Sequence, residues 1–287
     1  MNMTKVKDNA LHFMEKFKDS KATLLGAAQA YYYLLSIIPL FVVCFAIIPY
    51  LNINPDDTVQ FLHDVMPSEM ASVFEDNILS FVETPRGGLL TVGIIGVLWS
   101  ASGAMNTLME SVNQAYDVEE TRSFIKVRLI AIGLTLGMIF TLIFAMLIPI
   151  FGSEVLGFVE DYFGFNSTFA SIFESLRWVI GFVLLIVFLM ILLRFAPNIH
   201  VPFKTVLPGA LVTGVLWIIT SFGFSFYVSN FGNYSAVYGS LGGIIILMIW
   251  FYLTGIILIV GAITNVLFQE KKQIDPETTE EHDRYSS

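Results

Sequence analysis

The chain has 287 residues, of which 55% are hydrophobic and only 14% are charged, and its mean hydropathy is +0.73. An ordinary soluble domain carries about 25% charged residues, so this composition excludes a water-soluble fold and indicates a membrane protein. The net charge of −9 argues against a nucleic-acid partner, because such a surface needs clustered lysines and arginines to neutralise phosphates.

The first 21 residues are polar and basic. Their lysines interleave with Leu11, Phe13, Met14 and Phe17. Basic and apolar residues mixed at this spacing predict a short amphipathic helix that lies on the cytoplasmic surface of a membrane.

Six apolar segments follow, and each is long enough to cross roughly 30 Å of hydrocarbon, which takes about 20 helical residues. We therefore expect an all-α, polytopic transmembrane domain over residues 22–269, followed by a disordered acidic cytoplasmic tail over residues 270–287. The predicted spans lie near residues 24–50, 89–111, 127–151, 176–196, 206–229 and 241–268.

The lysines and arginines orient these spans. With the N-terminus in the cytoplasm, only Arg86 and Arg177 of the 15 lysines and arginines fall outside. This asymmetry predicts that both termini are cytoplasmic. In the long outer loop 52–88, Asn54-Pro55 is a helix start signal, so we expect two short amphipathic helices there. The apolar loop 152–175 is predicted to lie at the outer interface.

Polar or small residues recur at helical spacing in four of the spans, so they share one helix face in each. Such stripes can serve close helix packing, or they can line a cavity that admits a substrate. On the second interpretation, the candidates for a substrate cavity are Gln29, Tyr33, Ser102, Asn106, Glu110, Asn113, Ser221, Ser225, Thr254 and Asn265.

The short, uncharged loop over residues 230–243 combines glycines with aromatic rings. It is either an external gate or a tight turn with interfacial anchors. The gate and hinge candidates, which include a proline inside the first span, are Pro39, Tyr234, Tyr238, Gly239, Gly242 and Gly243.

Catalytic motifs are missing from the sequence, which has no nucleophile elbow, phosphate-binding glycine loop or HExxH pattern. Cys44 is the single cysteine, and the four histidines lie far apart. The acids Asp117, Glu119 and Glu120 beside Arg122 are interpreted as a solvated helix cap and not as a metal site. We therefore expect no enzymatic activity, no cofactor and no metal.

Several stretches of the sequence resemble the YihY/BrkB-type bacterial membrane proteins, a family once labelled ribonuclease BN. They are AAQAYYYLLSIIPL (27–40), LWSASGAMNTLMESVNQAYDVEETRSFIKVR (98–128), LLRFAPN (192–198), LPGALVTGVLW (207–217) and FSFYVSNFGNYSAVYGSLGGIIILMIWFYLTGIILIVGA (224–262).

This resemblance implies a six-helix protein of the bacterial cytoplasmic membrane and brings no catalytic residues with it. Some relatives are linked to lipid or lipopolysaccharide export. The leading hypothesis is a transporter of an amphipathic, lipid-like envelope molecule, with membrane lipids as partners. The alternative is a membrane scaffold or regulator of envelope biogenesis that transports nothing. A ribonuclease is the weakest reading, because the chain is acidic and lacks clustered metal ligands.

Overall fold

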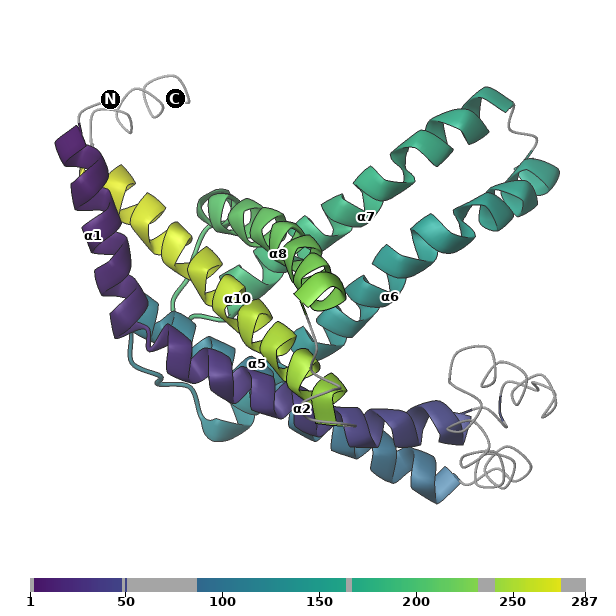
Figure 1. Cartoon of the computed structure of the whole chain (residues 1–287), viewed down its shortest axis with the longest axis horizontal. Helices are drawn as coiled ribbons and strands as arrows, with labels where there is room; N and C mark the ends of the chain where they lie inside the picture. The colour runs from purple at the N-terminus through teal and green to yellow at the C-terminus, as the bar shows by residue number, and fades with distance from the viewer. Residues whose placement is uncertain (1–2, 48–49, 51–86, 164–166, 232–240, 275–287) are drawn as a thin grey trace.

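The computed structural model describes residues 3–47, 50, 87–163, 167–231 and 241–274, and every regular element in these ranges is a helix (Figure 1). The protein is therefore all-helical in its described part. The helices are α1 (Met3–Asp19), α2 (Ala22–Ile47), α5 (Gly87–Ala115), α6 (Phe124–Phe163), α7 (Ser167–Phe195), α8 (Phe203–Phe231) and α10 (Gly242–Ile274).

Five of these helices contain stretches that are long and apolar enough to cross a membrane, and α7 contributes a shorter apolar stretch, Val179–Phe195, in the described part of the chain. This supports a polytopic membrane protein. The five stretches are Ala22–Val43, Gly87–Ala115, Phe124–Phe144, Phe203–Asn230 and Gly242–Lys271.

The six long helices pack as a closed ring. Contacts run from α2 to α5, and from there to α6, α7, α8 and α10, and α10 returns to α2. One end of this ring carries the short connections 20–21, 116–123 and 196–202, and we call it the turn end. The α2/α5 pair and the α6/α7 pair come together towards the turn end, and their far ends lie wide apart (Figure 1).

Helices α6 and α7 are longer than the sequence predicts. α6 has 40 residues, which corresponds to about 60 Å at 1.5 Å per residue. The apolar segment 152–175, expected as an interfacial loop, is thus mostly a helical continuation of both elements. Hydropathy indicates which residues can lie in lipid. It does not indicate where a helix ends, which depends on capping or on a break in the backbone hydrogen bonds.

The N-terminal helix α1 is fastened to the end of α10. His12 Nε2 lies 2.7 Å from Glu270 Oε2, and Lys16 Nζ lies 3.2 Å from Glu270 Oε1. α10 extends to Ile274, so residues 270–274, which the sequence assigns to the tail, continue the helix. The remainder of the predicted tail lies outside the described residues.

Glycines let α10 approach two neighbours at backbone distance. A methyl group on Gly255 would lie 3.2 Å from both Cα and the carbonyl oxygen of Gly26 on α2. A methyl group on Gly209 of α8 would lie 2.5 Å from Asn265 Cγ and still closer to the carbonyl oxygen of Gly261. Real Cβ atoms essentially never come within 3.0 Å of another heavy atom, so the Gly209 crossing requires glycine, whereas a methyl group on Gly255 would need the facing backbone to give by a few tenths of an ångström.

Two sequence predictions fall outside the described residues. These are the amphipathic helices of the outer loop, over residues 51–86, and the gate candidates Tyr234, Tyr238 and Gly239.

Candidate binding cavity

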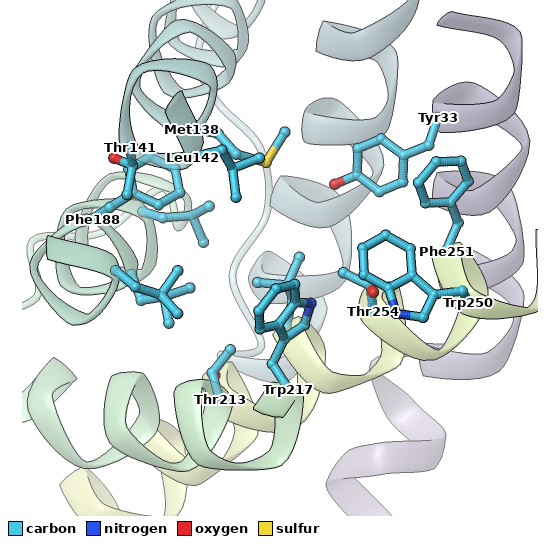
Figure 2. A pocket seen from close by; sticks show the side chains of 14 residues that line it. Tyr33, Met138, Thr141, Leu142, Phe188, Thr213, Trp217, Trp250, Phe251 and Thr254 are labelled. Carbon is cyan, nitrogen blue, oxygen red and sulfur yellow. The ribbon is translucent and has the colours of Figure 1, made fainter. Parts of the chain in front are cut away.

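A cavity of about 160 Å³ lies inside the helix ring. Side chains from α2, α6, α7, α8 and α10 surround it, and Figure 2 shows them converging on its centre. The lining side chains are Tyr33, Met138, Thr141, Leu142, Leu185, Phe188, Leu189, Leu192, Thr213, Trp217, Trp250, Phe251, Thr254 and Leu258.

One wall of the cavity is aromatic. The Trp217 and Trp250 rings meet edge to face with centroids 6.0 Å apart, and Phe251 lies 5.6 Å from Trp250 and 5.4 Å from Tyr33. The opposite wall, from α6 and α7, is mainly aliphatic. Aromatic pairs in offset or edge-to-face geometry stabilise each other beyond their buried area, so this wall is held in shape without a ligand.

The few polar groups of the cavity differ in how they are used. Thr141 and Thr213 donate their hydroxyl hydrogens to carbonyl oxygens one turn back in their own helices, at 2.8 Å each. The hydroxyl of Tyr33 is fully buried and has no hydrogen-bond partner among the described residues. It points into the cavity (Figure 2).

Of the ten residues that the sequence proposes for a substrate cavity, Tyr33 and Thr254 line this one. Gln29 and Asn265 are fully buried at the crossings of α10 with α2 and α8. Asn265 Oδ1 accepts a hydrogen bond of 2.7 Å from the Gly209 amide. The Gln29 side-chain amide and Asn265 Nδ2 are also buried, but they have no hydrogen-bond partner among the described residues.

The polar stripe of α5 lies apart from the central cavity. Asn106, Glu110 and Asn113 line a second pocket of about 460 Å³ beside the α5–α6 connection, together with Gln114. Ser102 donates to the Trp99 carbonyl of its own helix at 3.1 Å. Periodicity correctly groups these residues on one helix but does not reveal which neighbour covers that face.

The remaining candidates lie elsewhere on the helices. Ser221 is half-buried and Ser225 is exposed on α8. Pro39 packs against Gly96, where a methyl group would lie 3.0 Å from Pro39 Cβ. Gly242 and Gly243 form the first turn of α10.

Asn113 belongs to a network that joins two connections at the turn end, which we call the turn clamp. Asn113 Nδ2 donates to Glu120 at 2.9 Å, and its Oδ1 accepts from the Asn198 amide at 2.7 Å. The Asn198 side chain donates to the Glu119 carbonyl and to the Thr121 hydroxyl, at 2.8 Å each. These bonds tie the α5–α6 connection to the α7–α8 connection.

Arg122 completes the turn clamp. Its guanidinium pairs with both oxygens of Glu120, at 2.8 and 2.5 Å, and donates to the carbonyl oxygen of Ala196 at 3.1 Å. The hydrogen bonds from Arg122 hold the pKa of the Glu120 carboxyl below its ordinary value. Asp117 takes a left-handed backbone conformation, with φ of 54°, just after α5. It ends that helix through bonds from Asp117 N to Gln114 O and from Val118 N to Asn113 O.

Sequence reasoning did not find Asn198 or the bridging role of Arg122. The available signal was the Pro197-Asn198 pair that follows an apolar helix, because asparagine after proline favours a side-chain-bonded turn.

The ring of apolar helices defines a polytopic helical membrane protein, and an apolar cavity lies among the helices. The Virulence factor BrkB family profile matches residues 13–286. The chain therefore belongs to this family of bacterial membrane proteins.

Three relatives illustrate the range of the family. The putative ribonuclease-like protein YfkH of Bacillus subtilis (strain 168) is 43% identical over 88% of this chain and 92% of its own. A UPF0761 membrane protein of Tolumonas auensis is 26% identical over 87% of this chain and 82% of its own. A UPF0761 membrane protein of Photobacterium profundum is 27% identical over 90% of this chain and 80% of its own. No solved structure gives a significant match.

Proposed function

We propose that this protein translocates an amphipathic, lipid-like molecule across the bacterial cytoplasmic membrane. The central cavity carries this proposal, because a bundle that served only as a scaffold would need no space inside its helix ring. Its wall is almost entirely apolar. Apolar pockets with few polar groups are typical of sites for small hydrophobic ligands.

The arrangement of the helices supports a path for such a molecule. The far ends of the α2/α5 and α6/α7 pairs lie wide apart, whereas the turn clamp holds the other end together (Figure 1). We place the turn end in the cytoplasm, so that the separated far ends of the two pairs face the outer leaflet. The basic residues Arg122, Lys126 and Arg128 beside the turn end favour that orientation.

A lipid-like substrate fits the chain better than RNA does, although one relative is named ribonuclease-like. The net charge of −9 repels a polyanion. The cavity also offers no cationic side chain among its lining residues.

Reconstituted vesicles test the proposal. When the fluorescent phospholipid is added to the outer leaflet alone, protein in the liposomes should increase the rate at which label becomes protected from an impermeant quencher, relative to protein-free vesicles. Phospholipids with several headgroups are compared, because the proposal specifies only the class of the substrate.

A cavity-filling variant provides the specific control. Thr254→Phe should slow translocation, because Thr254 lines the cavity on α10. Met248→Phe adds a ring of the same kind to the same helix at a site that is 43% exposed, and it should leave the rate unchanged. Equal rates in vesicles with and without protein, for every lipid, would instead favour the scaffold.

A further inference from the structure

The polarity of the central cavity restricts what part of a lipid it can hold. No lysine, arginine, histidine or acid is among its lining residues. An isolated charge in such surroundings costs far more free energy than a neutral polar group that finds a hydrogen bond. A charged headgroup is therefore a poor occupant of this cavity.

The cavity nevertheless offers hydrogen-bond donors, and the Tyr33 hydroxyl is one of them. The Tyr33 residue is only 8% exposed, and its hydroxyl is buried without a partner among the described residues. Buried polar groups in folded proteins are nearly always hydrogen-bonded. In Figure 2 this hydroxyl points to the middle of the cavity, away from its own helix. It can donate to a carbonyl, ester or hydroxyl oxygen of a bound molecule.

The size of the cavity sets the length of the segment that fits. Its volume is about 160 Å³, and an engineered apolar cavity of about 150 Å³ holds one benzene molecule. A short stretch of hydrocarbon with one neutral oxygen group fills such a space, whereas a whole lipid does not.

From these three observations we infer that the central cavity is a binding site for the uncharged ester-and-chain region of a lipid, with the Tyr33 hydroxyl donating to an ester oxygen. The inference rests on the proposed function, because it names the part of the substrate that this site recognises. The aromatic wall of Trp217, Trp250 and Phe251 contacts the chain, and the charged headgroup stays outside the helix ring.

Tryptophan fluorescence can test this in purified protein, independently of transport. Trp99 and Trp178 are replaced by Phe, so that the two cavity tryptophans remain as reporters. The probes are methyl 6-bromohexanoate and 6-bromohexanoate, which share the chain and the quenching bromine and differ in charge at neutral pH. The ester should quench saturably, and the anion should quench weakly and without saturation.

Tyr33→Phe then isolates the hydrogen bond, because it keeps the ring and removes only the hydroxyl. It should weaken binding of the ester about threefold to tenfold, as expected for the loss of one hydrogen bond. Thr254→Phe should abolish saturable quenching. A variant that retains Trp99 alone should show only linear quenching, because Trp99 is 64% exposed on the outside of the bundle.

Equal quenching by the ester and the anion would overturn the inference, and so would unchanged ester affinity in Tyr33→Phe. Both results are distinct from a failure of the proposed function. Saturable ester binding in a protein that does not move lipid would retain the site and refute translocation. Lipid movement without saturable ester binding would support translocation and refute the site.

Discussion

Replacement of Gly209 by alanine probes the tight crossing of α8 and α10. The added methyl group would lie 2.5 Å from Asn265 Cγ and nearer still to the Gly261 carbonyl oxygen, whereas ordinary contacts begin at 3.4 Å. Helices α8 and α10 must therefore move apart by roughly 1 Å. This movement also breaks the 2.7 Å hydrogen bond from the Gly209 amide to Asn265 Oδ1.

The cost has three parts. Overpacking of a tight core costs about 1–3 kcal/mol, and a broken buried hydrogen bond costs about 1–3 kcal/mol. Alanine regains about 0.5–1 kcal/mol over glycine inside a helix. The net loss in the free energy of unfolding is about 1–5 kcal/mol, which lowers the apparent melting temperature by roughly 2–20 °C.

The measurement is the amount of monodisperse protein that survives heating in detergent, followed by size-exclusion chromatography. Gly223→Ala is the matched control, because it lies on the same helix and a methyl group there meets nothing within 4 Å. It should melt at or slightly above the temperature of the unmodified protein. If Gly209→Ala melts within about 2 °C of Gly223→Ala, the helix crossing is not as tight as described and the reasoning fails.

Three further predictions concern the turn clamp and a second glycine. Asn198→Ala removes two hydrogen bonds of 2.8 Å and should lower the melting temperature in the same assay by a few degrees, which corresponds to about 1–2 kcal/mol. The folded-state pKa of Glu120 is lowered by hydrogen bonds from Arg122, so its stabilisation is complete above the ordinary glutamate pKa and is lost as pH falls through the lowered value. Between about pH 6 and about pH 3, the melting temperature should therefore fall more steeply with pH in the unmodified protein than in Glu120→Gln. Gly103→Ala places a methyl group 2.6 Å from Tyr32 Cδ1, and because a side chain can turn away, it should lower the melting temperature less than Gly209→Ala does.

Matched variants give these three predictions their controls. Asn230→Ala removes only an exposed bond to the Phe226 carbonyl one turn back and should melt unchanged. Gly133→Ala meets nothing within 4 Å and is the control for Gly103→Ala. Parallel acid melting curves for Glu120→Gln and the unmodified protein would contradict the electrostatic account, and so would a larger loss in Gly103→Ala than in Gly209→Ala.

The helices themselves could be predicted from the sequence because lipid leaves the backbone few alternatives to internal hydrogen bonding. An apolar run of sufficient length must therefore be helical, as α5 and α10 are. The ends of the helices could not be predicted in the same way. Glu270 continues α10 through contacts with His12 and Lys16, residues about 250 positions earlier in the chain.

The residues of the candidate site could be predicted less well from the sequence, for a related reason. Helical spacing places Asn106, Asn113 and Ser102 on one face, but it does not say whether a cavity, a connection or their own helix receives each side chain. In the structure Asn113 bonds to the α7–α8 connection and Ser102 to its own helix. The aromatic residues Trp217 and Trp250 line the cavity, and an aromatic residue in an apolar span gives no sign of which surface it faces.

The two glycine crossings of α10 determine which parts of the bundle can change position. Backbone meets backbone where α10 crosses α2 and α8, so these contacts leave the three helices little room to shift against one another. At the α7–α8 contact, by contrast, Gly214 faces the flexible end of the Ile186 side chain. If the proposed translocation uses a conformational cycle, we expect the α6/α7 pair to move against α2, α8 and α10, because its contact with α8 at Gly214 is made by a flexible side chain. The turn clamp, which ties the α5–α6 connection to the α7–α8 connection, would then have to open.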